Sequence, residues 1–355
     1  MNKFILDIRA LRDNILRIKQ RLRPDALFCA MVKANAYGHG LKHISRHIEH
    51  IVDYFGVACV SEGLKLRQLN ISKPILVVGS FDEIMAKKAM LNYLTLTVFS
   101  CEQIEHMTKI CKQLNICASV HIKVNTGMNR LGVNDKTEFI SMLNMLENNE
   151  YIKLKGVFSH LAREDEKYIK RQNKIFKQYI KLCKAFKGLI FHLSSSFAAI
   201  NYQKYNYNMV RIGLAMYGYA HSEHISLKPV ITIISNIRSI LKVKKGSFVG
   251  YGGALRCQRN MTLAVVPLGY ADGINLKLSN TASVYMVGQP APIVGRVCMD
   301  MLICNITDLG VKLDDEVVIF DNINNATVWS KICGNHEYEI LTSFKINRMK
   351  VVIRK

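Results

Sequence analysis

Short apolar runs that alternate with longer amphipathic segments constrain the fold of this chain most. Eight such runs, each of strand length and rich in Val and Ile, occur in the first two-thirds of the 355 residues. Runs of this kind are typical of strands buried on both faces, and helical patterns lie between them. Eight strand–helix repeats predict an α/β fold with a (β/α)8 barrel, and an open doubly wound sheet is the alternative. The runs span residues 27–33, 54–59, 74–79, 94–100, 118–126, 154–161, 188–195 and 208–216.

The pattern changes after residue 222. Strand-like segments separated by turn residues, such as Gly252-Gly253 and Asp272-Gly273, replace the long helical periods. We therefore expect two domains, a barrel in residues 1–222 and a mostly β domain in residues 223–355. No low-complexity segment separates them.

Charge and cysteine usage narrow the function classes. The net charge is +22, but Lys and Arg are spread along the whole chain, which argues against a specific nucleic-acid partner. The ten cysteines form no CxxC pair, so we expect a reducing, cytoplasmic setting and no structural zinc. The basic N-terminal segment carries Asp7 and Asp13, which is atypical of a transit peptide. No apolar run is long enough to span a membrane.

Residues 31–40 read MVKANAYGHG, and Lys33 directly follows the first expected strand. The carboxyl ends of the strands carry the active site in (β/α)8 barrels. Burial there disfavours the ammonium form and makes the amine a better nucleophile, suited to condense with an aldehyde. The alternative is a lysine whose charged end simply reaches solvent from the strand end.

The string VKANAYGHG resembles the pyridoxal-phosphate (PLP) attachment motif of alanine racemases, and further matches follow in the family's order along the chain. The resemblance implies a PLP-dependent enzyme that interconverts L- and D-alanine by two bases and supplies D-alanine for peptidoglycan. It also implies a barrel followed by a β domain that residues 4–9 join, paired head to tail in a homodimer with shared active sites.

The same resemblance assigns residues in the barrel. Lys33 would be one base, and Arg130 would lie near the substrate carboxylate, oriented by a carbamylated Lys123. His160 would lie beside the pyridine ring. Arg211 would face the pyridine nitrogen, and because arginine donates a hydrogen bond but keeps its proton, it would favour racemisation over transamination.

Phosphate contacts are implied at the exits of the last two barrel strands, since backbone amides beside glycine approach phosphate oxygens closely. The residues assigned to this role are Tyr37, Ser196, Gly213, Leu214 and Tyr338.

In the second domain, Tyr251 matches the family's second base, and the backbone amide of Met299 matches a contact to the substrate carboxylate. Tyr270, Arg296 and Asp300 resemble the wall that the partner subunit adds to the active site. These assignments depend on the segments VGYGGALR, PLGYADGI and GRVCMD.

The chain departs from the family pattern at several points. Asn125 stands where the family usually has Asp, Ser195 stands where it usually has Asn, and residues 253–255 and the tail 348–355 differ from the usual strings. Three alternatives remain open: a racemase or decarboxylase of this fold with another substrate such as serine, a PLP-homeostasis protein, and a basic nucleic-acid-binding protein. The homeostasis proteins resemble the barrel alone, so the second domain argues against them.

Overall fold

The computed structural model describes residues 1–355, and the chain divides into two compact units. The barrel unit consists of Arg12–Ala36 and Leu41–Leu227. The β unit consists of Met1–Leu11, Tyr37–Gly40 and Lys228–Lys355.

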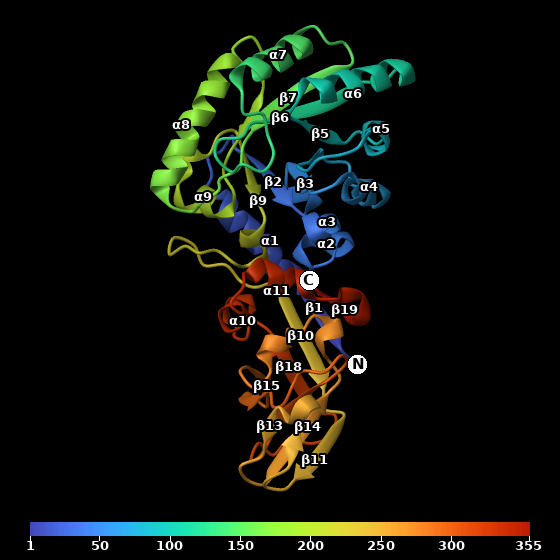
Figure 1. Ribbon diagram of the computed structural model, residues 1–355, viewed down its shortest axis with the longest axis vertical. Coiled ribbons are helices and arrows are strands. Elements are labelled where there is room, and N and C mark those ends of the chain that lie inside the picture. Colours follow the sequence, from blue (N-terminus) through green and yellow to red (C-terminus); the bar gives the residue numbers. More distant parts are fainter. The chain divides into compact units, whose positions relative to one another are not determined.

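Eight parallel strands form the sheet of the barrel unit in the order β8-β7-β6-β5-β4-β3-β2-β9 (Figure 1). The last strand, β9, pairs with the first, β2, and a backbone hydrogen bond of 3.1 Å from Arg211 to Ser194 joins the exits of β9 and β8. The sheet is therefore a nearly closed barrel, which confirms the predicted fold and excludes the open doubly wound sheet. The strands are β2 (Leu27–Met31), β3 (Tyr54–Val57), β4 (Ile75–Val77), β5 (Thr95–Val98), β6 (Ala118–Lys123), β7 (Ile152–Phe158), β8 (Ile190–His192) and β9 (Met209–Ile212).

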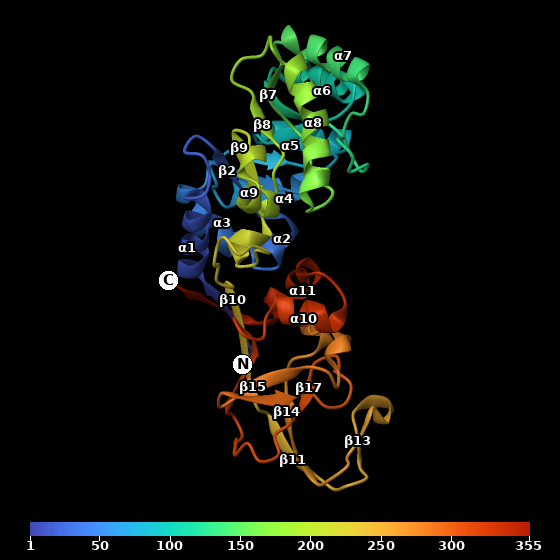
Figure 2. The same ribbon diagram turned by 90° about the vertical axis from the view of Figure 1, so that its left-hand side faces the viewer.

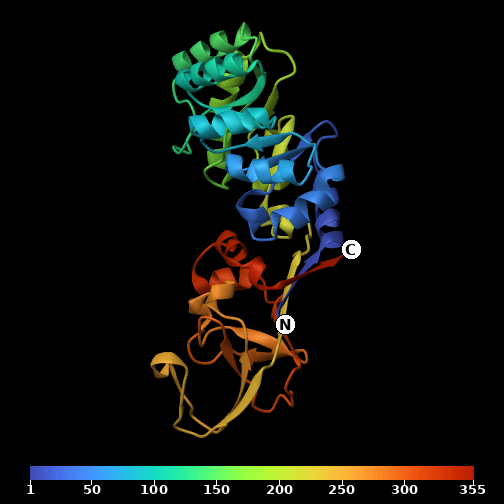
Figure 3. The ribbon, with the colours of Figure 1, turned by 90° about the vertical axis from the view of Figure 1, so that its right-hand side faces the viewer.

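The apolar character of these strands follows from their position between an inner core and an outer layer of helices (Figure 1, Figure 3). Every residue of β4, β5 and β9 is buried, as expected of strands covered on both faces. Several helices begin at an Asp or Ser whose side chain accepts a hydrogen bond from the first turn. The helices are α1 (Ile8–Lys19), α3 (Leu41–Ile48), α4 (Val60–Gln68), α5 (Glu83–Leu91), α6 (Cys101–Leu114), α7 (Lys136–Glu147), α8 (Glu166–Leu182) and α9 (Ser196–Asn201), and the short element α2 (Lys33–Tyr37) is a left-handed turn.

The β unit contains three sheets. A six-stranded sheet has the order β16-β15-β18-β10-β1-β19, a three-stranded sheet has the order β11-β14-β17, and β12 pairs with β13 alone. The segment that carries β12 and β13 extends away from the three-stranded sheet (Figure 2). The strands are β1 (Lys3–Asp7), β10 (Ile231–Asn236), β11 (Ser239–Val243), β12 (Phe248–Val249), β13 (Leu255–Arg256), β14 (Met261–Val266), β15 (Ser283–Met286), β16 (Gln289–Pro292), β17 (Leu302–Asn305), β18 (Glu316–Phe320) and β19 (Lys350–Arg354).

Aromatic packing fastens two helices, α10 (Ala326–Cys333) and α11 (Glu337–Ser343), to the six-stranded sheet. The Phe320 ring lies 5.2 Å from that of Trp329 and 5.0 Å from that of Phe344, both edge to face. The N-terminal strand reaches the same core, since Phe4 lies 6.3 Å from Phe344. No helix of the chain combines the length and apolar character needed to cross a membrane.

Candidate active site

Lys33 lies just beyond the carboxyl end of β2, where the apolar strand gives way to a turn. Burial lowers the pKa of Lys33 below its ordinary value. The charges of Arg130 and Arg211 lower this pKa further, whereas the Glu62 carboxylate raises it. A lysine in this environment has an enlarged share of free amine, which suits it to attack a carbonyl carbon.

The four residues after Lys33 form a left-handed turn, because residues 34–37 have φ between 51° and 55°. This conformation costs L-residues roughly 1–2 kcal/mol each. Glu62 holds the turn at its start, since its carboxylate accepts hydrogen bonds from the backbone N–H groups of Ala34 (2.6 Å) and Ala58 (2.9 Å). The lysine-bearing segment is thereby tied to the exit of β3.

Arg211, on β9, is buried and is held from several sides by hydrogen bonds that its guanidinium donates. One nitrogen, Nη1, donates to His192 Nδ1 (2.6 Å) and to the His192 carbonyl (3.2 Å). The other, Nη2, donates to the carbonyls of Ser159 (2.7 Å) and Leu193 (3.1 Å) and to His160 Nδ1 (3.2 Å). The guanidinium is thus fixed in orientation by the exits of β7 and β8.

Phe158, the last residue of β7, organises the same region. Its ring stacks on His192 with centroids 4.6 Å apart and planes 7° from parallel. Two cations lie over this ring, with Arg211 at 5.2 Å and Lys123 at 5.5 Å from its centroid. The Phe158 ring therefore contacts His192, which accepts a hydrogen bond from Arg211, and also lies under the cationic groups of Arg211 and Lys123.

Lys123 ends β6 and is only 6% exposed. Burial, followed by the charges of Arg130, Arg211 and Lys33, lowers the pKa of Lys123 to about 8. Arg130 itself is exposed on the loop after β6. Burial and the same cations lower the pKa of His160 to about 3, so this imidazole is neutral.

The loop before Arg130 is built around Asn125, the residue that departs from the family pattern. Its Oδ1 accepts hydrogen bonds from the backbone N–H groups of Gly127 and Asn129, both at 3.0 Å. Its Nδ2 donates to Asn129 Oδ1 (2.9 Å) and to Asn134 Oδ1 (2.5 Å). An aspartate could make the first pair of bonds but not the second, so this chain orders the loop with a cluster of amides.

Ser196 and Gly213 come together at the exits of β8 and β9. The Ser196 hydroxyl accepts hydrogen bonds from the backbone N–H groups of Gly213 (3.0 Å) and Ala215 (3.4 Å). Leu214 lies between these two amides. Ser195 caps α9 without a side-chain hydrogen bond to it. The backbone amides and hydroxyl gathered here are groups that bind phosphate oxygens.

Four of the predicted site residues are therefore cations that act on one another: Lys33, Lys123, Arg130 and Arg211. Burial, and after it their mutual repulsion, lowers the pKa of both lysines, and an anionic ligand would relieve that repulsion. The barrel exits thus suit a ligand that carries phosphate or carboxylate groups.

In the β unit, Tyr37 and Tyr338 are brought together, with ring centroids 5.8 Å apart. Tyr37 is buried, whereas Tyr338 is 42% exposed. The neighbouring Gly38 allows this approach, because a Cβ atom there would lie 2.0 Å from the Leu341 carbonyl oxygen of α11. The structure therefore pairs two tyrosines that the sequence places about 300 residues apart.

Tyr251, Tyr270 and Met299 lie on turns of the β unit that contact one another through their backbones. Gly250, just before Tyr251, packs against the backbone of Arg296, and a Cβ atom there would lie 3.0 Å from its nitrogen. Tyr270 donates a backbone hydrogen bond of 3.0 Å to Cys298, next to Met299. Tyr251 and Met299 are 70% and 54% exposed, so both are available to a partner or ligand outside this chain.

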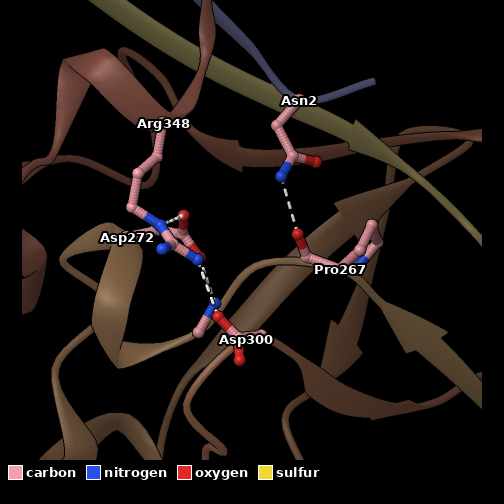
Figure 4. A network of polar contacts seen from close by, with 6 residues as sticks. Asn2, Pro267, Asp272, Asp300 and Arg348 are labelled. Atoms are coloured by element: carbon pink, nitrogen blue, oxygen red, sulfur yellow. Dashed lines mark hydrogen bonds and ion pairs between the residues drawn. The ribbon is translucent and has the colours of Figure 1, made fainter.

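Arg348 orders this region through two carboxylates (Figure 4). Its guanidinium donates to Asp272 Oδ1 (2.8 Å) and Asp300 Oδ1 (2.6 Å). Asp272 is buried, and its other oxygen accepts from the Gly269 backbone N–H at 2.9 Å. Asp300 is therefore joined to the turn that carries Tyr270 by Arg348, a residue of the tail 348–355 that differs from the family pattern.

Sequence reasoning also missed Glu62, His192 and Phe158. Glu62 is an ordinary helix residue in the sequence, and only its two backbone hydrogen bonds reveal its role. Phe158 and His192 are the last residues of β7 and β8, at the barrel edge where site residues gather, but they lie inside the predicted runs 154–161 and 188–195. The sequence therefore places them in barrel strands but does not place them at the strand ends.

The fold and these residues define a barrel enzyme with a partly buried lysine of lowered pKa among cations. The family models for the N-terminal and C-terminal domains of alanine racemase match residues 6–221 and 230–353. The alanine racemase of Thermodesulfovibrio yellowstonii is 34% identical over 362 residues, which cover 97% of this chain and 96% of that protein. The chain belongs to the alanine racemase family, and it is an isomerase.

Solved structures agree with this assignment. The alanine racemase of Clostridium difficile 630 superposes with a TM-score of 0.94 at 32% identity, covering 99% of this chain and 95% of that one. The alanine racemase from Bacillus anthracis with bound L-Ala-P has a TM-score of 0.91 at 30% identity, covering 100% and 95%. The family resemblance drawn from VKANAYGHG is thus confirmed.

Proposed function

We propose that this protein interconverts L-alanine and D-alanine with PLP held by Lys33, in a cytoplasmic homodimer. The observation that carries the proposal is the half-buried lysine of lowered pKa at the exit of β2, surrounded by cations, in a member of this family. The expected product, D-alanine, would serve peptidoglycan synthesis.

The barrel residues fit this cofactor. The hydroxyl of Ser196 and the amides around Gly213 would hold the phosphate, with Leu214, Tyr37 and Tyr338 in support. When bound, PLP supplies an aldehyde carbon that bonds to an amine and a ring that accepts electron density from the α-carbon. The cluster of cations is what an anionic cofactor and an anionic substrate require.

Arg211 would meet the pyridine nitrogen as a hydrogen-bond donor. Arginine remains protonated, so it would leave that nitrogen largely unprotonated and limit the electron withdrawal of the ring. This restraint favours return of the proton to the same carbon, which is racemisation. His160, which is neutral and bonded to Arg211, would lie beside the ring.

Two bases would move the proton at the α-carbon, Lys33 on one face and Tyr251 on the other. Arg130 and the backbone amide of Met299 would bind the substrate carboxylate. Tyr251 would come from the second subunit, together with a wall of Tyr270, Arg296 and Asp300. The high exposure of Tyr251 and Met299 in the single chain supports this arrangement.

The cytoplasmic setting is supported by the cysteines. Six of the ten are buried, as suits reduced thiols that pack as small apolar groups.

Mixing two inactive variants tests the shared site. Lys33→Ala and Tyr251→Phe would each be inactive alone, but a mixed dimer contains one intact site and should recover part of the activity. The assay follows the optical rotation of L-alanine, with L-serine as the competing substrate and PLP omitted as a control. Racemisation by the Lys33→Ala homodimer, or no recovery despite demonstrated subunit exchange, would overturn the proposal.

A further inference from the structure

A buried hydrogen-bonded row of side chains, Arg211–His192–His121, continues from Arg211 into the barrel interior. Beyond His192, the next member is His121 of β6, whose Nδ1 lies 2.8 Å from His192 Nε2. Both histidines have no exposed surface. The family resemblance and the proposed function give His121 no role.

The positions of the ring protons on His192 and His121 can be assigned by starting from Arg211. Arg211 is always a donor, so His192 Nδ1, 2.6 Å from Arg211 Nη1, must be the unprotonated acceptor. Neutral His192 therefore carries its proton on Nε2 and donates it to His121 Nδ1. His121 in turn must carry its own proton on Nε2. The opposite arrangement would set N–H of His192 against N–H of Arg211.

Charge supports this assignment. Burial, reinforced by the Arg211 cation, lowers the pKa of His121 to about 3 and that of His192 well below its ordinary value. Both rings are therefore neutral near pH 7, and each has one donor and one acceptor nitrogen.

The fold makes specific room for His121. Its partner across β6 and β7 is Gly156, and the register of the two strands shifts between Val120 and His121. A Cβ atom at position 156 would lie 2.8 Å from both Nδ1 and Cε1 of the imidazole. A larger residue on β7 would therefore displace the ring from His192.

The position of His121 has a cost. Its Nε2 is buried without a hydrogen-bond partner. An unsatisfied buried donor destabilises the folded state, and an apolar side chain would avoid this effect. The His121 imidazole, unlike an apolar side chain, provides Nδ1 as the acceptor for the N–H of His192.

We propose that His121 is a positioning residue for Arg211. By accepting the proton of His192 Nε2, it holds His192 in the one neutral form that can accept from Arg211, and so fixes the guanidinium. The tautomer assignment is independent of the proposed function. Its consequence for catalysis rests on the proposed role of Arg211 opposite the cofactor.

Two variants of similar shape separate hydrogen bonding from packing. His121→Asn retains an oxygen near the place of Nδ1 and can still accept from His192, whereas His121→Leu cannot. Long-range 1H–15N spectra of protein labelled with 15N at histidine distinguish the two neutral tautomers of each ring. The signals that disappear in the variants at position 121 are those of His121. The spectra are recorded with and without PLP, and kcat and KM for alanine are measured alongside.

We expect His192 to carry its proton on Nε2 in the wild type and in His121→Asn, and to lose this form in His121→Leu. With the guanidinium released, kcat of the Leu variant should fall by about 10- to 100-fold at little change in KM, while the Asn variant stays near wild type. A proton on His192 Nδ1 in the wild type, or equal kcat in the two variants, would overturn the proposal. Should the Leu variant not fold, the wild-type spectrum decides. Absence of racemase activity in the wild type would defeat the proposed function but leave the tautomer result standing.

Discussion

Lys123 provides a prediction whose size follows from the structure. Its pKa is lowered from 10.5 to about 8 by burial and neighbouring cations. At pH 7 a pKa of about 8 leaves roughly 9% of the amine unprotonated, whereas 10.5 leaves about 0.03%. The free amine is therefore about 300-fold more abundant at Lys123 than at an ordinary lysine.

Free amine is the form that reacts with carbon dioxide, forming an N–C bond and releasing a proton. The resulting carbamate is an anion, which the neighbouring Arg130 would stabilise. We therefore expect Lys123 to be carbamylated near neutral pH. The modification should increase as pH rises from 6 towards 8 and reverse on acidification, because acid protonates the amine.

The assay is 13C NMR of the protein in 13C-labelled bicarbonate. One slowly exchanging carbamate signal is expected in the wild type and should be absent from Lys123→Gln. Lys155→Gln, which removes an exposed lysine of β7, is the matched control and should keep the signal. A signal that persists in Lys123→Gln, or none in the wild type at pH 8, would refute the reasoning.

Three further substitutions test other contacts. Arg348→Met should lower the free energy of unfolding in urea denaturation, because buried Asp272 loses its partner, and this loss should exceed that from removing the exposed ion pair of Arg238. Equal losses would contradict this. Gly156→Ala should destabilise by about 1–3 kcal/mol, since its Cβ would lie 2.4 Å from a backbone oxygen of β8, and an unchanged melting temperature would count against that packing. Glu62→Gln should move the acidic limb of the rate profile to lower pH, because the Glu62 carboxylate raises the pKa of Lys33, and an unmoved limb would exclude that influence.

The barrel could be predicted because parallel strands covered on both faces leave continuous apolar runs in the sequence. Closure could not, because it depends on the pairing of β2 with β9, which are far apart along the chain. The turn residues likewise predicted a second, mostly β region, but not how its strands are ordered. That order brings β1, from the N-terminus, between β10 and β19.

For the site, Lys33 could be found because its neighbours in sequence are also its neighbours in space. The roles of His192, His121 and Glu62 could not be predicted, because they depend on which atoms face each other across the barrel. The sequence shows a histidine within a predicted strand but not that its Nδ1 meets a guanidinium. The predicted roles of Arg130, Tyr251 and Met299 remain predictions, since each requires a ligand or a second subunit.

The left-handed turn at residues 34–37 has a consequence for how the enzyme matures. Its backbone strain totals about 4–8 kcal/mol, comparable with the entire stability of many domains, so a nascent chain could not retain it. The turn forms only once the surrounding strands and Glu62 are in place to hold it. Lys33 therefore reaches its position beyond β2 late in biogenesis, only after the surrounding barrel has folded.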